Sequence, residues 1–226
     1  MPVDPHAGVE ITAFSQVPPP AQGLVRDLRV RWACDEIELP YRARLMDAMA
    51  PRPPEYLREQ PFAQIPTYHE GGTHLFESGA ILLHIGEKDE RLLPRDPAQR
   101  GRAIAWLFAA LNSVEPALQA LFSIDHFYAG EEWAKLRRPG AAEFARLKLS
   151  RVSAWLGDRA WLEDRFTIGD LMMITVLRIL NYNGMVENFP NLATYVASGE
   201  ARPAFKSALD AQLSALCQHQ LADAEI

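Results

Sequence analysis

The segment over residues 64–87, QIPTYHEGGTHLFESGAILLHIGE, restricts the fold more than any other part of the sequence. The glycine pair at 71–72 separates two short runs, 65–69 and 73–76, and this pattern predicts an antiparallel hairpin. Ser78 then begins a run of apolar residues at helical spacing. A strand, a turn, a strand and a helix therefore follow one another directly.

The residues before this segment predict further strands and helices. Short strands are expected at 11–14 and 41–45, with a helix over 22–37 between them and a short helix at 55–59 before the hairpin. The three prolines at 18–20 place an irregular loop after the first strand. The apolar residues of the first helix share one face, with several charges opposite. The order of elements is that of a thioredoxin-like α/β domain.

The composition changes after residue 87. A charged, proline-containing stretch, residues 88–98, is typical of a linker between domains. Residues 99–226 follow helical spacing and are expected to form an all-helical domain. Residues 10–87 then form the α/β domain, preceded by an N-terminal extension over 1–9. Helices are expected within 104–121, with a bend at Pro116, and at 141–156, 168–180, 192–198 and 203–217.

Thr167 and Asp170 have the spacing of a capping box at the start of the helix over 168–180. In such a box each of the two side chains accepts a hydrogen bond from a backbone amide at the helix start. Phe166 and Leu171 are placed to form the accompanying hydrophobic contact. A structural role for the pair is favoured over a catalytic one, since a cap alone is worth about 1 kcal/mol.

The charge balance and hydropathy exclude several kinds of partner. The chain has a net charge of -6, from 29 acidic and 23 basic residues, and its arginines are scattered, so nucleic acid is not an expected partner. No apolar run approaches the roughly 18 residues of a membrane helix, and the N-terminus lacks the regions of a signal peptide. We expect a cytoplasmic protein without a membrane partner.

The cysteines and histidines show no pattern of a redox or metal site. Cys34 and Cys217 form no closely spaced pair, and we expect both to be reduced. The hairpin turn can bring His69 and His74 close together, but no third ligand is evident. Ordinary strand surface is the favoured interpretation of the two histidines, and no metal is expected.

Residues 64–87 resemble the glutathione-binding segment of the cytosolic glutathione transferases. The run TIGDLMMITVL, residues 167–177, resembles the helix with a capping box in the second domain of that family. The resemblance covers most of the chain from about residue 10 to residue 217. It implies an α/β N-terminal thioredoxin-like domain, an all-α C-terminal domain, a homodimer, and glutathione as a co-substrate.

The resemblance implies glutathione contacts at two places in the hairpin segment. The Ile65-Pro66 bond is a candidate cis peptide, which would expose the backbone of Ile65 to pair with the cysteinyl unit. At the strand-to-helix junction, Ser78 can receive the γ-glutamyl carboxylate and Glu77 the adjacent ammonium. Gln64 resembles a family residue that contacts the γ-glutamyl portion. Without a ligand, the same residues would form only a tight turn and a helix cap.

The group that activates the thiol departs from the family pattern. Members commonly use Tyr, Ser or Cys near the end of the first strand. This chain has Phe14 about where the Tyr would be, and Val25 and Arg26 about where the Ser or Cys would be. Ser15 offers the only hydroxyl close to that strand end, and Arg26 offers a cation. For Arg26, a solvated side chain on the first helix is the alternative.

The expected function is conjugation of the glutathione thiolate to an electrophilic small molecule. Val17, Trp106 and Phe108 are candidates to line an apolar co-substrate pocket between the domains, with ordinary core packing as the alternative for the two aromatic residues. Reduction of disulfides or peroxides by glutathione is one alternative function. A noncatalytic, glutathione-binding regulatory protein of the same fold is another.

Overall fold

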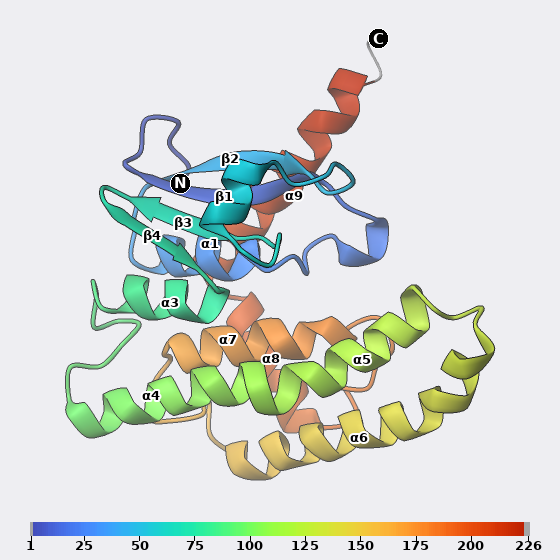
Figure 1. Ribbon diagram of the computed structural model, residues 1–226. Helices are drawn as coiled ribbons and strands as arrows, with labels where there is room; N and C mark the ends of the chain where they lie inside the picture. The colour runs from blue at the N-terminus through green and yellow to red at the C-terminus, as the bar shows by residue number, and fades with distance from the viewer. Residues whose placement is uncertain (1, 224–226) are drawn as a thin grey trace. The chain divides into compact units, whose positions relative to one another are not determined.

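The computed structural model describes residues 2–223, with side chains described for residues 2–216. The chain divides into two compact units (Figure 1). The first, the sheet unit, contains residues 2–92 and 202–223, and the second, the helical unit, contains residues 93–201. The first unit is a thioredoxin-like α/β unit and the second is helical, as the sequence predicts.

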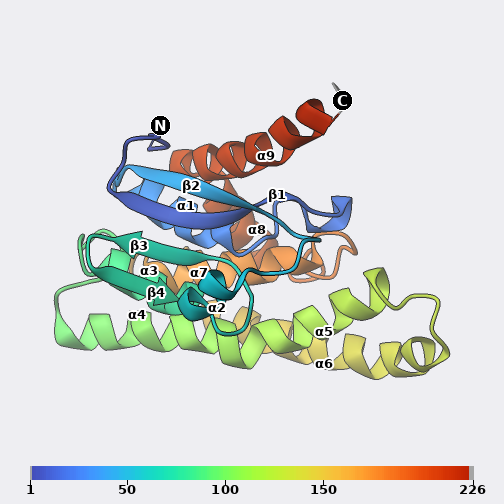
Figure 2. The ribbon, with the colours of Figure 1, turned by 45° about the horizontal axis from the view of Figure 1, so that its top comes forward.

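The elements of the sheet unit are β1 (Val9–Gln16), η1 (Pro19–Ala21), α1 (Asp27–Glu36), β2 (Tyr41–Asp47), α2 (Pro54–Glu59), β3 (Thr67–Glu70), β4 (Thr73–Phe76), α3 (Ser78–Gly86) and α9 (Pro203–Asp223). The strands lie in the order β2-β1-β3-β4. β1 is parallel to β2 and antiparallel to β3, and β3 forms the predicted hairpin with β4. Helices α1 and α3 pack side by side against the strands (Figures 1 and 2).

Alternating burial along β1 explains how the sheet is covered. Val9, Ile11 and Ala13 are buried, and of the residues that alternate with them Glu10 and Phe14 are partly exposed, because successive side chains point to opposite faces. Thr12 is the exception on that second face, since its hydroxyl is buried in hydrogen bonds to Tyr56 and Thr67. The adjacent helix α3 buries the apolar residues that its helical spacing selects, which are Ile81, Leu82 and Ile85. The core of the sheet unit is therefore built from the apolar side chains that both periodicities predict.

The N-terminal residues belong to the sheet unit rather than forming the predicted extension. The Tyr41 amide donates to the Pro2 carbonyl at 2.8 Å, and the Asp4 amide donates to the Tyr41 carbonyl at 2.9 Å. β1 itself already begins at Val9. The chain before residue 10 is therefore attached to the edge of β2, because β2 is the outer strand and offers unpaired backbone groups there.

The C-terminal helix α9 also belongs to the sheet unit, which differs from the prediction of one helical domain over 99–226. The ring of Phe205 packs edge-on against Trp32 of α1, with ring centres 4.9 Å apart. Arg202 donates to Glu36 through two bonds of 2.6 and 2.7 Å. Helical spacing alone does not reveal which neighbour a helix will cover, and α9 covers α1.

α1 departs from its predicted pattern because its charged residues are buried together with its apolar ones. Asp27, Arg29 and Arg31 are 3% exposed or less. Asp27 accepts from Arg31 Nε at 2.7 Å and from Gln212 Nε2 of α9 at 2.6 Å. α9 therefore pairs with part of the face on which the sequence places charges. The helix also begins at Asp27 rather than at residue 22.

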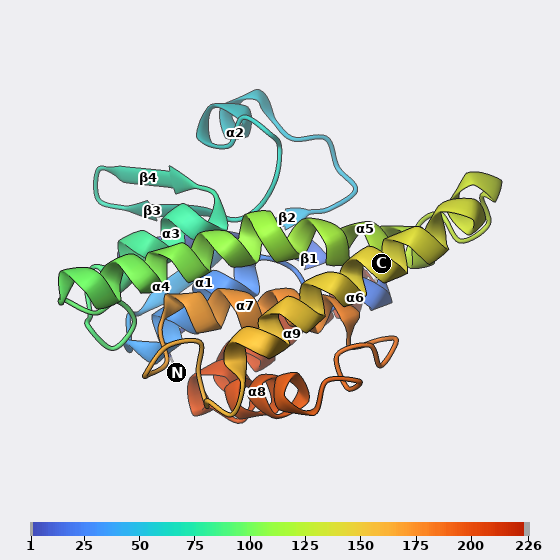
Figure 3. The same cartoon turned by 90° about the horizontal axis from the view of Figure 1, so that it is seen from below.

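The helical unit contains α4 (Pro97–Ala109), a π-helical segment η2 (Ala110–Val114), α5 (Glu115–His126), α6 (Glu132–Leu156), α7 (Ile168–Leu177), a 3-10 segment η3 (Arg178–Leu180) and α8 (Pro190–Glu200). The interruption predicted at Pro116 corresponds to η2, after which Pro116 lies in the first turn of α5. α7 packs against α4 and α8, and each of its residues is buried (Figure 3). This helix is the centre of the unit.

The capping box predicted at the start of α7 is confirmed. The Gly169 amide donates to Thr167 Oγ1 at 3.1 Å, and the Thr167 amide donates to Asp170 Oδ2 at 3.0 Å. Asp170 Oδ1 accepts from the Leu162 amide at 2.8 Å and from the Tyr195 hydroxyl at 2.9 Å. The threonine and the aspartate therefore have the structural role that the sequence pattern favours.

The run Pro97–His126 is long and apolar enough to cross a membrane by length and composition alone. The sequence pattern did not predict this candidate. Half of the most apolar window of the run is buried inside the protein. A core helix of a folded domain meets the same criterion, so one such helix is weak evidence for a membrane span.

Candidate functional site

The Ile65-Pro66 peptide bond is cis, as the sequence predicts, and it lies immediately before β3. Hydrogen bonds fix the chain on both sides of it. The Tyr56 hydroxyl donates to the Gln64 carbonyl at 2.6 Å. The Thr67 amide donates to the Thr12 hydroxyl at 2.7 Å. Side chains of α2 and β1 therefore hold the cis bond in place.

The backbone of Ile65 is left available between these two anchors. Within residues 2–223, its amide and carbonyl have no hydrogen-bond partner, although the residue as a whole is only 6% exposed. An extended segment with free backbone groups can accept a further strand or an extended ligand. Gln64, the preceding predicted contact, is exposed and Pro66 is buried.

Residues 77 and 78 lie at the same end of the hairpin as the cis bond, because Thr67 pairs with Phe76 across β3 and β4. Glu77 occupies the N-cap of α3 with a φ of 70°. This left-handed conformation is uncommon for residues other than glycine, and such conformations cluster at functional sites. The side chain of Glu77 is exposed, as a contact with a ligand ammonium requires.

Ser78 is the first residue of α3 rather than its cap, which corrects the capping role considered from the sequence. In the part of the chain that the structure describes, no side chain caps this helix. The amides of its first turn therefore lack an intrahelical acceptor and carry the positive end of the helix dipole. The Ser78 hydroxyl, in a residue 4% exposed, accepts a bond from Nη1 of buried Arg29 at 3.1 Å. Together these groups can bind an anion.

The two candidates for thiol activation lie at the end of β1 and the start of α1. Ser15 falls at an irregularity in the pairing of β1 with β2 and is 6% exposed. Its hydroxyl donates to the Met46 carbonyl at 3.3 Å. Because a hydroxyl has one proton, Ser15 must give up this bond before it can donate to a sulfur. Arg26 is half-buried at the N-cap of α1.

Two charged groups near these candidates were missed in the sequence. The Arg52 guanidinium lies 5.2 Å from the centre of the Phe14 ring and donates to backbone carbonyls in the loop after β2. Asp27 lies in the first turn of α1, where burial raises its pKa and bonds from Arg31 and α9 oppose that increase. Neither group belongs to a recognisable motif, because Arg52 bonds to backbone carbonyls and one partner of Asp27, Gln212, comes from the distant helix α9.

The three residues predicted to line a co-substrate pocket belong to different units. Val17 is half-buried and follows β1 in the sheet unit. In the helical unit, Trp106 donates from Nε1 to Glu163 at 2.6 Å, and its ring lies 5.3 Å from that of Trp155. Phe108 is 49% exposed. The pocket between the domains stays a prediction.

The hairpin pairs His69 with His74, and their ring centres lie 4.5 Å apart, as the sequence predicts. His69 Nε2 lies 3.0 Å from Glu59, and burial lowers the pKa of His69. Among the described residues, no group of three or more His, Cys, Asp or Glu side chains is placed to hold a metal ion. Cys34 is fully buried and burial raises the pKa of its thiol, which suits packing rather than nucleophilic attack.

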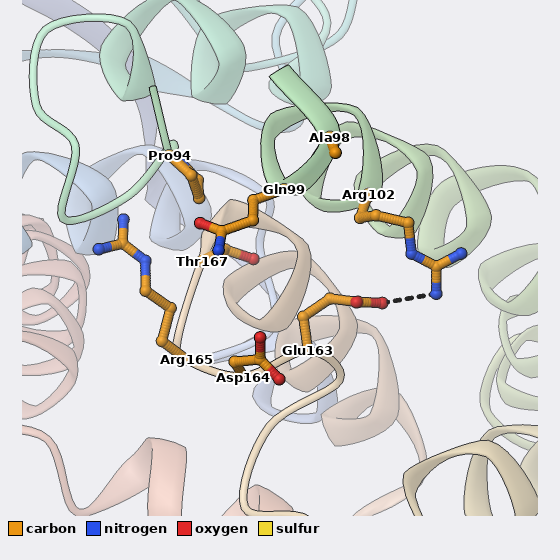
Figure 4. A pocket seen from close by; sticks show the side chains of 8 residues that line it. All are labelled: Pro94, Ala98, Gln99, Arg102, Glu163, Asp164, Arg165 and Thr167. Carbon is orange, nitrogen blue, oxygen red and sulfur yellow. Dashed lines mark hydrogen bonds and ion pairs between the residues drawn. The ribbon is translucent and has the colours of Figure 1, made fainter. Parts of the chain in front are cut away.

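A pocket of about 170 Å³ lies in the helical unit between the start of α4 and the segment before α7 (Figure 4). It is lined by Pro94, Ala98, Gln99, Arg102, Glu163, Asp164, Arg165 and Thr167. Arg102 donates to Glu163 at 2.8 Å, so these two wall charges compensate each other. None of the predicted glutathione contacts lines this pocket.

Known proteins similar to the chain include glutathione S-transferases and disulfide-bond oxidoreductases. A family model described as the N-terminal domain of glutathione S-transferase matches residues 22–87, which include the cis bond and the start of α3. Glutathione S-transferase GST-4.5 of Xanthomonas campestris pv. campestris is 30% identical over 168 residues, covering 71% of this chain and 78% of that relative. Disulfide-bond oxidoreductase YfcG of Escherichia coli is 34% identical over 101 residues, covering 41% of this chain and 47% of that relative.

A solved structure extends the similarity to the fold of nearly the whole chain. It is that of a glutathione transferase family member from Pseudomonas fluorescens, described with two glutathione bound. The TM-score is 0.77 at 26% identity, and the match covers 89% of this chain and 92% of that one.

Proposed function

This chain belongs to the glutathione transferase family, and from that premise we propose that it binds glutathione at the end of the β3–β4 hairpin. The observation that carries the proposal is the uncapped start of α3 beside Ile65, whose backbone groups have no partner within the described residues. The Ile65 backbone pairs with the cysteinyl unit. Ser78 receives the γ-glutamyl carboxylate, Glu77 pairs with the ammonium, and Gln64 contacts the same γ-glutamyl portion.

The reaction that we propose is conjugation of glutathione to an electrophilic small molecule. The thiolate attacks an electrophilic carbon, a carbon–sulfur bond forms, and the leaving group departs with the bonding electrons. The rate comes from stabilising the thiolate and from holding both reactants together. Val17, Trp106 and Phe108 are the proposed apolar contacts of the electrophile. Glutathione is a co-substrate, and the reaction needs no metal.

Stabilisation of the thiolate falls to Ser15 or Arg26 in this proposal. A free thiol has a pKa near 8.5, and each unit by which a site lowers it corresponds to about 1.4 kcal/mol. Arg26 adds its charge at the N-cap of α1, where the helix dipole is positive. Ser15 can add a hydrogen bond only by exchanging the Met46 carbonyl for the sulfur.

Binding and turnover test the two parts of the proposal separately. Calorimetric titration with glutathione is expected to show one site per chain, and an aryl halide is expected to be conjugated. Absence of binding would refute the glutathione site. Binding without turnover of an aryl halide, a mixed disulfide or a hydroperoxide would refute catalysis and favour a noncatalytic binding protein.

Reduction of disulfides by glutathione is the second candidate function. It is favoured by a relative named a disulfide-bond oxidoreductase and by a relative structure described with two glutathione bound. One glutathione thiolate attacks the substrate disulfide, forms a mixed disulfide and releases one half of the substrate as a thiolate. A second glutathione thiolate attacks the glutathione sulfur of the mixed disulfide, which gives glutathione disulfide and releases the other half of the substrate as a thiolate. Turnover of a mixed disulfide without conjugation of an aryl halide would select this function over transfer.

We also propose a cytoplasmic homodimer that has no nucleic-acid or membrane partner. The rings of Phe62 and Phe76 support self-association, because these residues are 65% and 38% exposed with ring centres 6.3 Å apart. Neighbouring exposed aromatic rings form an apolar patch that a second copy can cover. Sedimentation at micromolar concentration is expected to show a dimer that Phe62→Ser weakens. A monomer at that concentration would refute the proposal.

A further inference from the structure

The hydrogen bond between Arg29 and Ser78 connects the interior of α1 to the start of α3. Arg29 is 3% exposed, and its Nη1 lies 3.1 Å from Ser78 Oγ. A guanidinium only donates, so the serine oxygen accepts this bond with one lone pair and keeps its own proton. Among residues 2–223, that proton has no acceptor. The serine hydroxyl is therefore left to donate outward.

We propose that Arg29 is a positioning residue of the glutathione site, which orients the Ser78 hydroxyl toward the γ-glutamyl carboxylate and places a buried positive charge behind it. The inference rests on the proposed glutathione site. It adds to that site a residue that does not itself touch the ligand. Arg29 acts through Ser78, and its effect is confined to ligands that carry the carboxylate.

The charges around the start of α3 support this assignment. The first-turn amides of α3 carry the positive end of its dipole and have no side-chain cap within the described part of the chain. A guanidinium stays protonated throughout the accessible pH range, and a buried one is weakly screened by salt. The first-turn amides and the Arg29 guanidinium both bring positive charge to Ser78, whereas exposed Glu77 offers the negative charge for the neighbouring ammonium. The site thus offers positive charge to the carboxylate and negative charge to the ammonium of the γ-glutamyl unit.

A purely structural role for Arg29 makes a different prediction. If the bond only attached α1 to α3, its loss would loosen the end of the hairpin and lower the affinity for every ligand that binds there. If Arg29 orients Ser78, its loss affects glutathione and leaves unchanged a peptide without the carboxylate. Decarboxylated glutathione, γ-aminobutyryl-cysteinyl-glycine, keeps the ammonium, the thiol and the glycine carboxylate, so it distinguishes the two roles.

The experiment compares both peptides by calorimetric titration of the full chain. The wild type is expected to bind glutathione at least tenfold more tightly than the decarboxylated peptide. Arg29→Met is expected to lower the affinity for glutathione at least tenfold and to change the affinity for the decarboxylated peptide less than twofold. Ser78→Ala should likewise weaken the binding of glutathione alone, and the double variant should bind no more weakly than the weaker single variant, because the two residues act in series. Arg58 is an exposed arginine of α2, and Arg58→Met is the matched control, which should leave the affinity for both peptides unchanged.

Two results would overturn the inference: unchanged glutathione affinity in Arg29→Met, or an equal loss for both peptides. A wild type that fails to bind glutathione would instead refute the proposed function itself. Circular dichroism and thermal melting establish that each variant is folded. If Arg29→Met is unfolded, Arg29→Lys decides, because it keeps the charge without the planar donor fork. A loss of at least threefold for glutathione alone is expected there, and wild-type affinity for both peptides would overturn the inference.

Discussion

Replacement of Asp170 by asparagine is expected to destabilise the helical unit strongly. Asp170 is completely buried, and both of its carboxylate oxygens are used. Oδ1 accepts from the Leu162 amide at 2.8 Å and the Tyr195 hydroxyl at 2.9 Å. Oδ2 accepts from the Thr167 amide at 3.0 Å and the Thr167 hydroxyl at 3.3 Å. An asparagine keeps the shape but turns one of these oxygens into an NH₂ group, which donates.

The magnitude follows from the bonds that the variant loses. Whichever way the amide is oriented, one backbone amide and one hydroxyl face a donor in place of an acceptor. Hydrogen bonds to a charged group contribute about 1.5–3 kcal/mol each. With two such bonds lost, the free energy of unfolding at pH 7.5 should fall by about 3–6 kcal/mol. Urea denaturation followed by circular dichroism and by tryptophan fluorescence measures this change. Asp164→Asn is the matched control, because Asp164 is exposed in the segment just before α7 and its replacement should change stability by less than about 0.5 kcal/mol.

The pH dependence adds a second measurement of the same side chain. Burial raises the pKa of Asp170 from 3.8 to about 6, against the opposing effect of its hydrogen bonds. The folded protein therefore holds this proton more tightly than the unfolded chain. The resulting contribution to stability is complete below pH 3.8 and disappears as the pH rises through 6. The difference in unfolding free energy between the wild type and Asp170→Asn should widen by about 1.4 kcal/mol from pH 7.5 to pH 5.

Two results would refute this reasoning about Asp170. A loss below about 1 kcal/mol at pH 7.5 would mean that the four bonds do not stabilise the start of α7 as charge-assisted bonds do. A difference that narrows toward pH 5 would mean that the donors around the carboxylate outweigh its burial and lower its pKa.

Three further predictions concern the proposed site and a surface ion pair. Ser78→Ala should weaken glutathione binding by about 1–3 kcal/mol in calorimetry, and unchanged affinity would place the anion site elsewhere. Burial raises the pKa of Asp125, but hydrogen bonds from Arg138 and Tyr182 and the charge of Arg138 together outweigh it and hold that pKa below 3.8. The stability that ionised Asp125 contributes is present above pH 3.8 and is lost as the pH falls through the lower pKa of the folded protein. The unfolding free energies of the wild type and Asp125→Asn should therefore converge in acid, and a constant difference would contradict this. If the Ser15 hydroxyl stabilises the thiolate, Ser15→Ala should raise the kinetic pKa of bound glutathione by about one unit and lower turnover about tenfold at neutral pH. If the Arg26 charge is the main stabiliser, Arg26→Ala should raise that pKa instead, and high salt should weaken the effect. A pH–rate profile unchanged in both variants would leave backbone amides as the stabilising groups.

The features that the sequence predicts well are those whose causes are local. The hairpin follows from the glycine pair between two short runs, and the capping box follows from the spacing of Thr167 and Asp170. The cis Ile65-Pro66 bond was a candidate because only a bond before proline adopts this form readily. In each case the decisive interactions join residues within a few positions of one another, so the sequence pattern contains them.

The features that the sequence did not predict depend on distant partners. Helical spacing identifies α9 as a helix, but the contact between Phe205 and Trp32 that assigns it to the sheet unit joins the two ends of the chain. The sequence predicts an extension for residues 1–9 because the pairing of Pro2 with Tyr41 leaves no pattern in either segment. Domain boundaries predicted from composition alone cannot account for contacts between segments that lie far apart in the sequence.

Helix α1 shows most clearly why the candidate site was only partly predictable. A charged residue on a helix is normally assigned to solvent, because burying a charge without a partner costs several kcal/mol. That assignment fails when partners arrive from other elements, as Gln212 does for Asp27 and Ser78 does for Arg29. The same limit applies to Ser15, whose hydroxyl is visible in the sequence while its acceptor, the Met46 carbonyl, lies on another strand. Residue types therefore show which groups are able to bind an anion or a thiolate, and only the packing of α1 against its neighbours determines which of them are already engaged.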